Sequence, residues 1–73
     1  MKINISIKAD SNVSYYCGGW LVSREPFQIK LGNQAIANLV SGPMPCRVEI
    51  PGMEILDGSI RKSGNNGFFI IRQ

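Results

Sequence analysis

The chain opens with a regular alternation of apolar and polar residues. Ile3, Ile5 and Ile7 occupy every second position of residues 2–9, and the other positions are mostly lysine, asparagine and serine. A period of two is typical of a β-strand with one face in the core and the other in solvent. The sequence therefore predicts a strand over residues 2–9, and the short polar side chains of residues 10–12 predict a turn after it.

Residues 13–22 are rich in strand-forming residues but contain the pair Gly18–Gly19. This pair is either a two-residue hairpin turn or a bend within one long strand, and we favour the bend. Because Tyr15 and Tyr16 are adjacent, they point to opposite faces of a strand, and we expect one of them to be exposed. We expect Trp20, the single tryptophan, to fill the core of a domain this small.

The pattern resumes in residues 27–31, which predict a short strand with its apolar residues inward. The segment after it has two interpretations. Asn33 suits the N-cap of a short helix over residues 34–41 that Gly42 and Pro43 bring to an end. The alternative is a further strand through the same residues, and we favour the helix because it accounts for more of the sequence.

The second half of the chain consists of short apolar stretches separated by turn residues. Pro51–Gly52 fits the central positions of a type II turn, since proline presets the first dihedral angle and glycine accepts the positive second one. Asp57–Gly58 is a common signal for a two-residue hairpin. Together these signals predict a meander of four short strands over residues 46–50, 53–56, 59–62 and 68–72.

The last of these strands contains four consecutive apolar residues, Phe68, Phe69, Ile70 and Ile71. A strand with one face in solvent alternates, so an unbroken apolar run predicts that both faces are covered. Phe68 and Ile70 share one face, and Phe69 and Ile71 share the other. We expect one face to lie in the core and the other to lie under the helix or against another molecule.

These elements predict a single small domain over residues 1–73. A chain of this length buries only about 60% of the surface that it exposes when unfolded, so its core is small. The fold we expect is mainly β, a small partly closed barrel or roll of short antiparallel strands with at most one short helix. The alternative is an α+β fold in which the helix packs on an antiparallel sheet.

The composition argues against catalysis. Histidine is absent, which removes the usual general acid-base and metal-ligating side chain. Cys17 and Cys46 alone cannot form a tetrahedral zinc site, and no nucleophile has a base beside it at a suitable spacing. We therefore expect no enzymatic activity, no metal or other cofactor, and no small-molecule substrate.

The chain as given carries no segment that resembles a membrane span or a signal peptide. No apolar run approaches the roughly 18 residues that cross a bilayer, and the first ten residues alternate in polarity. We therefore expect a cytoplasmic protein without a membrane partner. In that reducing compartment we expect Cys17 and Cys46 to be free, buried thiols.

The loop between the last two predicted strands, Arg61–Gly67, combines an adjacent basic pair with two glycines. Glycine-rich turns can direct several backbone N–H groups at an anion. The spacing does not match a Walker loop, and no helix follows. We favour an ordinary hairpin turn that needs positive dihedral angles.

The first functional hypothesis is a non-catalytic module that binds a protein partner or self-associates into a homo-oligomer. It depends on the apolar run Phe68–Ile71, with Tyr15 and Tyr16 as further interface residues. The charged fraction of 18%, below the roughly 25% of typical domains, agrees with such a surface. An accessory or inhibitor-type protein that occludes a partner would have this form, and phage accessory proteins include β-rich chains of this size.

The alternative hypothesis is a small β-barrel that binds nucleic acid. The net charge of +3 favours anionic partners, although the basic residues are scattered along the chain. In this hypothesis Tyr15 or Tyr16 stacks on bases. The cations that would meet phosphates are Lys30, Arg47, Arg61 and Lys62.

Overall fold

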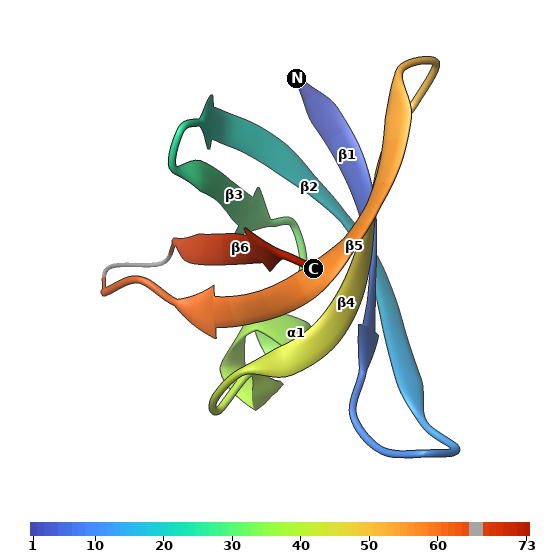
Figure 1. The fold of residues 1–73 in the computed structure, drawn as a ribbon. Helices are drawn as coiled ribbons and strands as arrows, with labels where there is room; N and C mark the ends of the chain where they lie inside the picture. The colour runs from blue at the N-terminus through green and yellow to red at the C-terminus, as the bar shows by residue number, and fades with distance from the viewer. Residues whose placement is uncertain (65–66) are drawn as a thin grey trace.

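The computed structural model describes residues 1–64 and 67–73, which form six strands and one short helix (Figure 1). In chain order the elements are β1 (Lys2–Lys8), β2 (Ser14–Arg24), β3 (Phe27–Leu31), α1 (Gln34–Leu39), β4 (Met44–Ile50), β5 (Glu54–Lys62) and β6 (Phe68–Arg72).

The strands close into an antiparallel barrel in the order β1-β2-β3-β6-β5-β4. Two three-stranded meanders, β1–β3 and β4–β6, are linked by α1 and pair with each other through β1 with β4 and β3 with β6. The predicted small barrel with one short helix is confirmed, and the barrel is fully closed rather than partly closed. Closure satisfies the backbone of the edge strands that an open sheet would leave unpaired.

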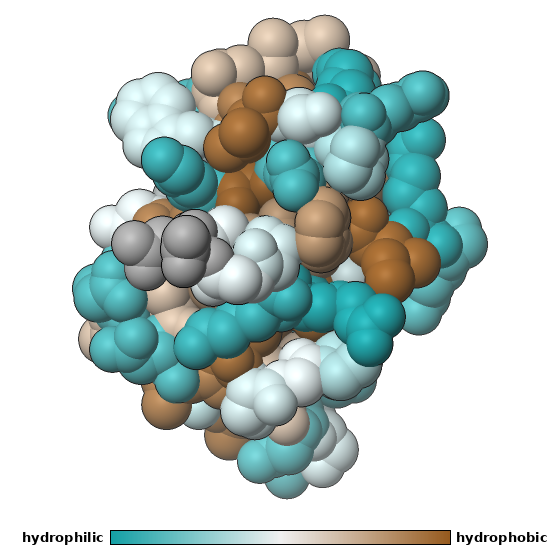
Figure 2. Space-filling model, turned by 90° about the vertical axis from the view of Figure 1, so that its left-hand side faces the viewer, coloured by the Kyte–Doolittle hydropathy of each residue, from teal (hydrophilic) through white to brown (hydrophobic). Residues whose placement is uncertain are grey.

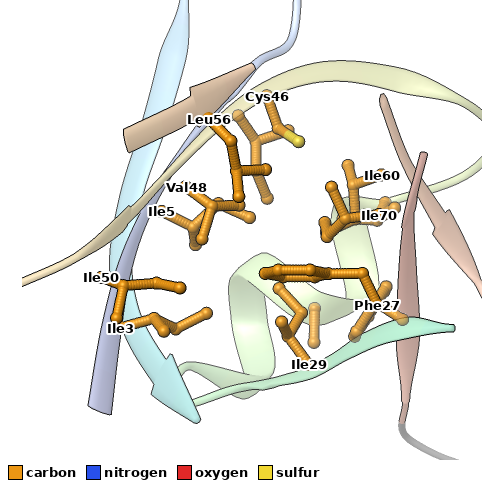
Figure 3. Close-up of a cluster of buried hydrophobic side chains, with 14 residues drawn as sticks. Ile3, Ile5, Phe27, Ile29, Cys46, Val48, Ile50, Leu56, Ile60 and Ile70 are labelled. Atoms are coloured by element: carbon orange, nitrogen blue, oxygen red, sulfur yellow. The ribbon is translucent and has the colours of Figure 1, made fainter. Parts of the chain in front are cut away.

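The core fills the barrel with side chains from alternate strand positions. Figure 3 shows labelled side chains from β1, β3, β4, β5 and β6 pointing toward one another. The buried apolar residues are Ile3, Ile5, Ile7, Phe27, Ile29, Ala37, Val40, Cys46, Val48, Ile50, Leu56, Ile60, Phe68 and Ile70. β2 supplies none of them.

The helix α1 closes one end of the barrel, at the bottom of Figure 1. The side-chain oxygen of Asn33 accepts a hydrogen bond from the Ile36 N–H at 3.1 Å, which is the expected N-cap. Ala37 and Val40 are buried in the core. The helix prediction is confirmed and the strand alternative is wrong, although the helix ends at Leu39, before the expected residue 41. A helix of six residues is stable only through this packing.

The other end of the barrel carries a cluster of charges. Arg24 pairs with Phe27 across β2 and β3, and Arg72 pairs with Gly58 across β6 and β5, so both arginines occupy core-facing positions at the ends of their strands. Glu54 accepts hydrogen bonds from Arg24 at 2.7 Å and from Arg72 at 3.1 Å. These ion pairs therefore lie across the open end, above the apolar core.

β2 runs without a turn through Gly18–Gly19, so the hairpin alternative is wrong. The long strand of the favoured interpretation is confirmed, but no register shift marks a bend at the two glycines. The irregularity lies further along, between Leu21 and Ser23, where the register with β3 shifts. Gly19 has a different role from a bend. A side chain at Gly19 would collide with the carbonyl group of Lys30, so glycine lets β2 and β3 approach closely.

The predicted hairpin at Asp57–Gly58 is wrong. β5 continues without interruption through both residues, and the described second half of the chain therefore has three strands rather than four. Gly58 is buried and a side chain there would collide with the carbonyl group of Ile71 on β6. Glycine is required here for close strand packing, while Asp57 points outward and binds Arg47.

The predicted turn at Pro51–Gly52 is confirmed. The Met53 N–H donates to the Ile50 carbonyl at 2.9 Å, and Gly52 has a φ of 75°, as a type II turn requires. This turn joins β4 to β5 and sets their register, which pairs Arg47 with Asp57.

The apolar run on β6 is divided between the two faces of the barrel wall. Phe68 and Ile70 are buried in the core, Phe69 is half-buried, and Ile71 remains 49% exposed on the outside. Because α1 contributes its buried residues to the end of the barrel, it does not cover this outer face. Of the two alternatives for covering Phe69 and Ile71, the helix or another molecule, the helix is therefore wrong.

Candidate functional site

β2 turns its tryptophan and one of its two tyrosines away from the core. Tyr16 is 73% exposed and Trp20 is 51% exposed. Cys17 and Gly19, two of the positions that face inward, carry much smaller groups. The expectation that Trp20 fills the core is wrong, whereas the expectation that one of the two tyrosines is exposed is confirmed. Tyr15, the inward tyrosine, is half-buried.

A hollow lies between the two aromatic rings. Tyr16 and Trp20 stand on the same face of one strand, about 13 Å apart along it, and Gly18 lies midway between them. The hollow has a volume of about 450 Å³ and is lined by Lys2 as well as by Gly18 and Gly19. Gly18 faces outward between the rings, and its lack of a side chain leaves the space between them open.

A second hollow, of about 500 Å³, lies on the other side of Tyr16. Its floor consists of Asn4 and Ser6 on β1, and Ile55 on β5 forms part of the far side. Tyr16 therefore separates two hollows, each large enough to admit a planar ring.

The charge on β1, β2 and β3 is positive. β1, β2 and β3 contain no aspartate or glutamate, and their exposed positions include Lys2, Lys8 and Lys30. Lys2 and Lys30 are the direct cross-strand neighbours of Trp20, one on each side. None of the three lysines takes part in an ion pair with the residues that the structure describes. We call this surface, the outer side of β1–β3, the lysine-aromatic face.

The four cations predicted from the sequence do not converge on one surface. Lys30 lies on the lysine-aromatic face. Arg47 is held by Asp57 through hydrogen bonds of 2.7 and 3.2 Å, which raise the pKa of the guanidinium and lower the pKa of the Asp57 carboxyl. Arg61 is exposed on β5, and Lys62 lines a hollow beside α1 that Lys30 also borders.

The two thiols are free, as the sequence predicts. Cys46 is buried and Cys17 is half-buried. Burial raises the pKa of both groups, and for Cys46 burial together with the nearby Asp57 charge raises the pKa to about 11. Because the thiolate is the reactive form, both groups are poor nucleophiles near neutral pH.

Other sites considered from the sequence contribute little. Within residues 1–64 and 67–73, no three histidine, cysteine, aspartate or glutamate side chains gather where they could hold a metal ion. The same residues include no helix that is long and apolar enough to cross a membrane. The predicted turn at Arg61–Gly67 includes Asn65 and Asn66, which lie outside the described residues.

A comparison with protein-family models, with curated protein sequences and with solved structures finds no match for this chain.

Sequence reasoning missed three members of the lysine-aromatic face: Lys2, Lys8 and Trp20. The alternation in β1 correctly placed both lysines on the solvent side, but only the closed strand order brings them beside β2. A signal for Trp20 was present in its spacing from Tyr16, since residues four apart on a strand share a face.

Proposed function

We propose that this protein binds single-stranded nucleic acid on the lysine-aromatic face. The observation that carries the proposal is the placement of Tyr16 and Trp20 outward on one strand, among lysines and without a carboxylate on β1–β3. Aromatic rings that stack on bases, combined with cations that follow the backbone, are the usual means of binding single strands.

The arrangement of β2 is costly if stability alone is considered. An aromatic side chain can bury roughly 150–250 Å² and is among the strongest contributors to a core. A small domain has few such groups, yet β2 leaves its tryptophan half-exposed and places Gly19 and Cys17 inside. A binding role for the exposed rings accounts for this distribution, whereas a role in folding does not.

The shape of the face favours unpaired bases over a duplex. The faces of bases are accessible for stacking only when the bases are not already stacked in a helix. The two hollows beside Tyr16 are of a size to receive single bases, one on each side of the ring. The described helix, α1, lies at the end of the barrel and presents no long helix to a major groove.

The lysines are placed to meet phosphates while the rings meet bases. Lys2 and Lys30 flank Trp20 directly across the strands, with Cβ atoms roughly 5 Å away. Lys8 lies further along the same outer side of β1. The cytoplasm, the compartment expected from the sequence, is where we propose that the protein meets its ligand.

The test is fluorescence anisotropy with labelled oligo-dT and with a duplex of equal length. We expect oligo-dT to bind more tightly than the duplex. Y16A and W20A should each weaken binding by roughly 5-fold to 150-fold, since stacking is worth about 1–3 kcal/mol per base. The matched control is L39A, which truncates a side chain that is similarly exposed at 49% but lies on α1.

Two results would contradict the proposal. One is the absence of salt-dependent binding to any single strand. The other is a loss of affinity in L39A as large as the loss in W20A, because binding would then not depend on the lysine-aromatic face.

A second candidate function is self-association through the outer side of β6. The observation that favours it is the exposure of Ile71 beside the half-buried Phe69 on the outer side of β6. The side of the molecule that carries β3 and β6 faces the viewer in Figure 2, where apolar side chains form separate patches among polar ones. Such divided patches are less typical of a large obligate interface than one continuous apolar surface.

This second candidate is tested by the mass in solution, measured by light scattering. If it is correct, the wild type is a dimer or larger, the double variant F69S/I71S is a folded monomer, and F68S/I70S is unfolded because it disrupts the core. A wild type that remains monomeric at high concentration would exclude it.

A further inference from the structure

We propose that the hollow between Tyr16 and Ile55 accepts one base of the bound strand and prefers guanine, with Glu49 and Asn4 as the residues that read its edge. This inference rests on the proposed function and adds a base preference to it. It starts from the presence of a carboxylate beside a surface that is otherwise positive.

Glu49 lies on β4, directly opposite Asn4 on β1 and Ile55 on β5. All three residues line the second hollow. Among the described residues, the other carboxylates of β4 and β5 are bound by arginines, Glu54 by Arg24 and Arg72, and Asp57 by Arg47. Glu49 takes part in no such ion pair within the described ranges. Its carboxylate is therefore available to a ligand.

The nearest cation on the same strand does not neutralise Glu49. Arg47 also lines the hollow, but two of its nitrogens donate to Asp57, at 2.7 and 3.2 Å. A free carboxylate repels a phosphate group, so the phosphates should pass along the lysines of β1–β3 instead. What Glu49 can attract is a hydrogen-bond donor on the edge of a base.

An ionised carboxylate has two acceptor oxygens and no donor. Guanine presents two adjacent donors on its pairing edge, N1–H and the N2 amino group, and they match the two oxygens of one carboxylate. Next to them guanine presents the acceptor O6, which can receive a hydrogen bond from the side-chain amide of Asn4. The cross-strand pair of Glu49 and Asn4 thus offers two acceptors and one donor side by side.

The other bases fit this pair less well. Adenine and cytosine each present one amino group next to a ring nitrogen acceptor, which would face the carboxylate unfavourably. Thymine and uracil present one N–H between two carbonyl oxygens. A bidentate contact to the matching base edge is worth about 1–3 kcal/mol of discrimination in known complexes.

The surroundings of this pair suit a planar ring. Tyr16 borders the hollow from β2 and can stack on the base, while Ile55, which is 62% exposed, offers apolar contact from β5. Gly18 is the neighbour of Asn4 on β2, and its lack of a side chain leaves the approach to Asn4 open. A Cβ atom at Gly18 would meet only the Ile3 carbonyl oxygen, at 3.7 Å, so the position is not closed by packing.

The test compares oligo-dT strands that carry a single central dG, dI, dA or dT, by fluorescence anisotropy. We expect the strand with dG to bind at least roughly fivefold more tightly than the strand with dT. Inosine lacks the N2 amino group, so dI should fall between dG and dT. The variant E49Q should lose the preference for dG and bind plain oligo-dT more tightly, because a negative charge is removed.

The matched control is E25Q, which makes the same change at an exposed glutamate in the turn between β2 and β3. It should keep the preference for dG. Thermal melting confirms that both variants are folded. If the wild type binds all four strands equally, or if E49Q keeps the full preference, the guanine assignment is overturned while the proposed function stands. If no strand binds, the proposed function fails and this inference fails with it.

Discussion

The dependence of binding on salt gives a quantitative prediction for the lysine-aromatic face. Each lysine that neutralises a phosphate of a single strand contributes about −0.7 to the slope of log K against log salt concentration. With Lys2, Lys8 and Lys30 in contact, we expect a slope of about −2. Between 50 and 200 mM salt this corresponds to roughly a 20-fold loss of affinity.

The double variant K2Q/K30Q removes the two cations that flank Trp20. The magnitude of its slope should decrease, from about 2 to about 0.7, so the same change in salt concentration should weaken binding only about threefold. The matched control is R61Q, which removes an exposed charge from β5, three strands away from β2 in either direction around the barrel. Anisotropy titrations with oligo-dT at several salt concentrations measure all three slopes.

The control decides whether the location of the charges matters. We expect R61Q to keep the slope of the wild type. If R61Q reduces the magnitude of the slope by about 0.7, the amount expected for one lysine of the lysine-aromatic face, the strand is attracted by net charge alone. The assignment of phosphates to Lys2 and Lys30 would then be refuted.

Two further predictions concern the barrel itself. G58A should destabilise the fold by about 1–3 kcal/mol, because the added methyl group collides with the Ile71 carbonyl group. The control G42A, where a Cβ meets nothing within 4 Å, should change stability by less than about 0.5 kcal/mol. Denaturant unfolding compares the two variants, and equal stabilities would contradict the close-packing role of Gly58. The hydrogen bond from Arg24 lowers the pKa of Glu54, so its stabilising contribution is present at neutral pH and is lost as the pH falls below the ordinary value of 4.5 through the lowered pKa. The melting temperature of E54Q should therefore lie below that of the wild type at pH 7 and approach it in acid, with E25Q as the control. A difference that persists in acid would show that the charge of Glu54 is not the cause.

Much of the barrel could be predicted because its strands obey simple patterns. The alternation of Ile3, Ile5 and Ile7 gave both the strand and its inward face, and Asn33 gave the start of the helix. Pro51–Gly52 gave a turn whose position fixes the register of β4 on β5. These signals are local, so no knowledge of the closed barrel was needed to interpret them.

The errors arose where one residue type serves two purposes. Asp57–Gly58 resembles a hairpin turn, but glycine is also required where two backbones approach closely, and the sequence does not distinguish these uses. Once β5 is continuous, Asp57 lies opposite Arg47 and neutralises it. That pairing removed Arg47 from the predicted set of free cations.

The orientation of Trp20 was missed because both faces of β2 carry apolar residues. Leu21 and Val22 are adjacent, so hydrophobicity does not tell which face is inside. The structure buries Gly19, where a side chain would collide with the Lys30 carbonyl group on β3, and so Trp20 on the next position points outward. The composition of the lysine-aromatic face likewise depends on strand order, a long-range property that local patterns do not contain.

The most direct test of nucleic-acid binding on this face uses the intrinsic fluorescence of Trp20. Because the chain contains one tryptophan, the emission of tryptophan reports on this position alone. On titration with oligo-dT, we expect the emission to be quenched as bases stack on the ring, and to recover when salt is added. An emission spectrum that stays unchanged at oligo-dT concentrations that saturate the anisotropy signal would show that the strand binds elsewhere.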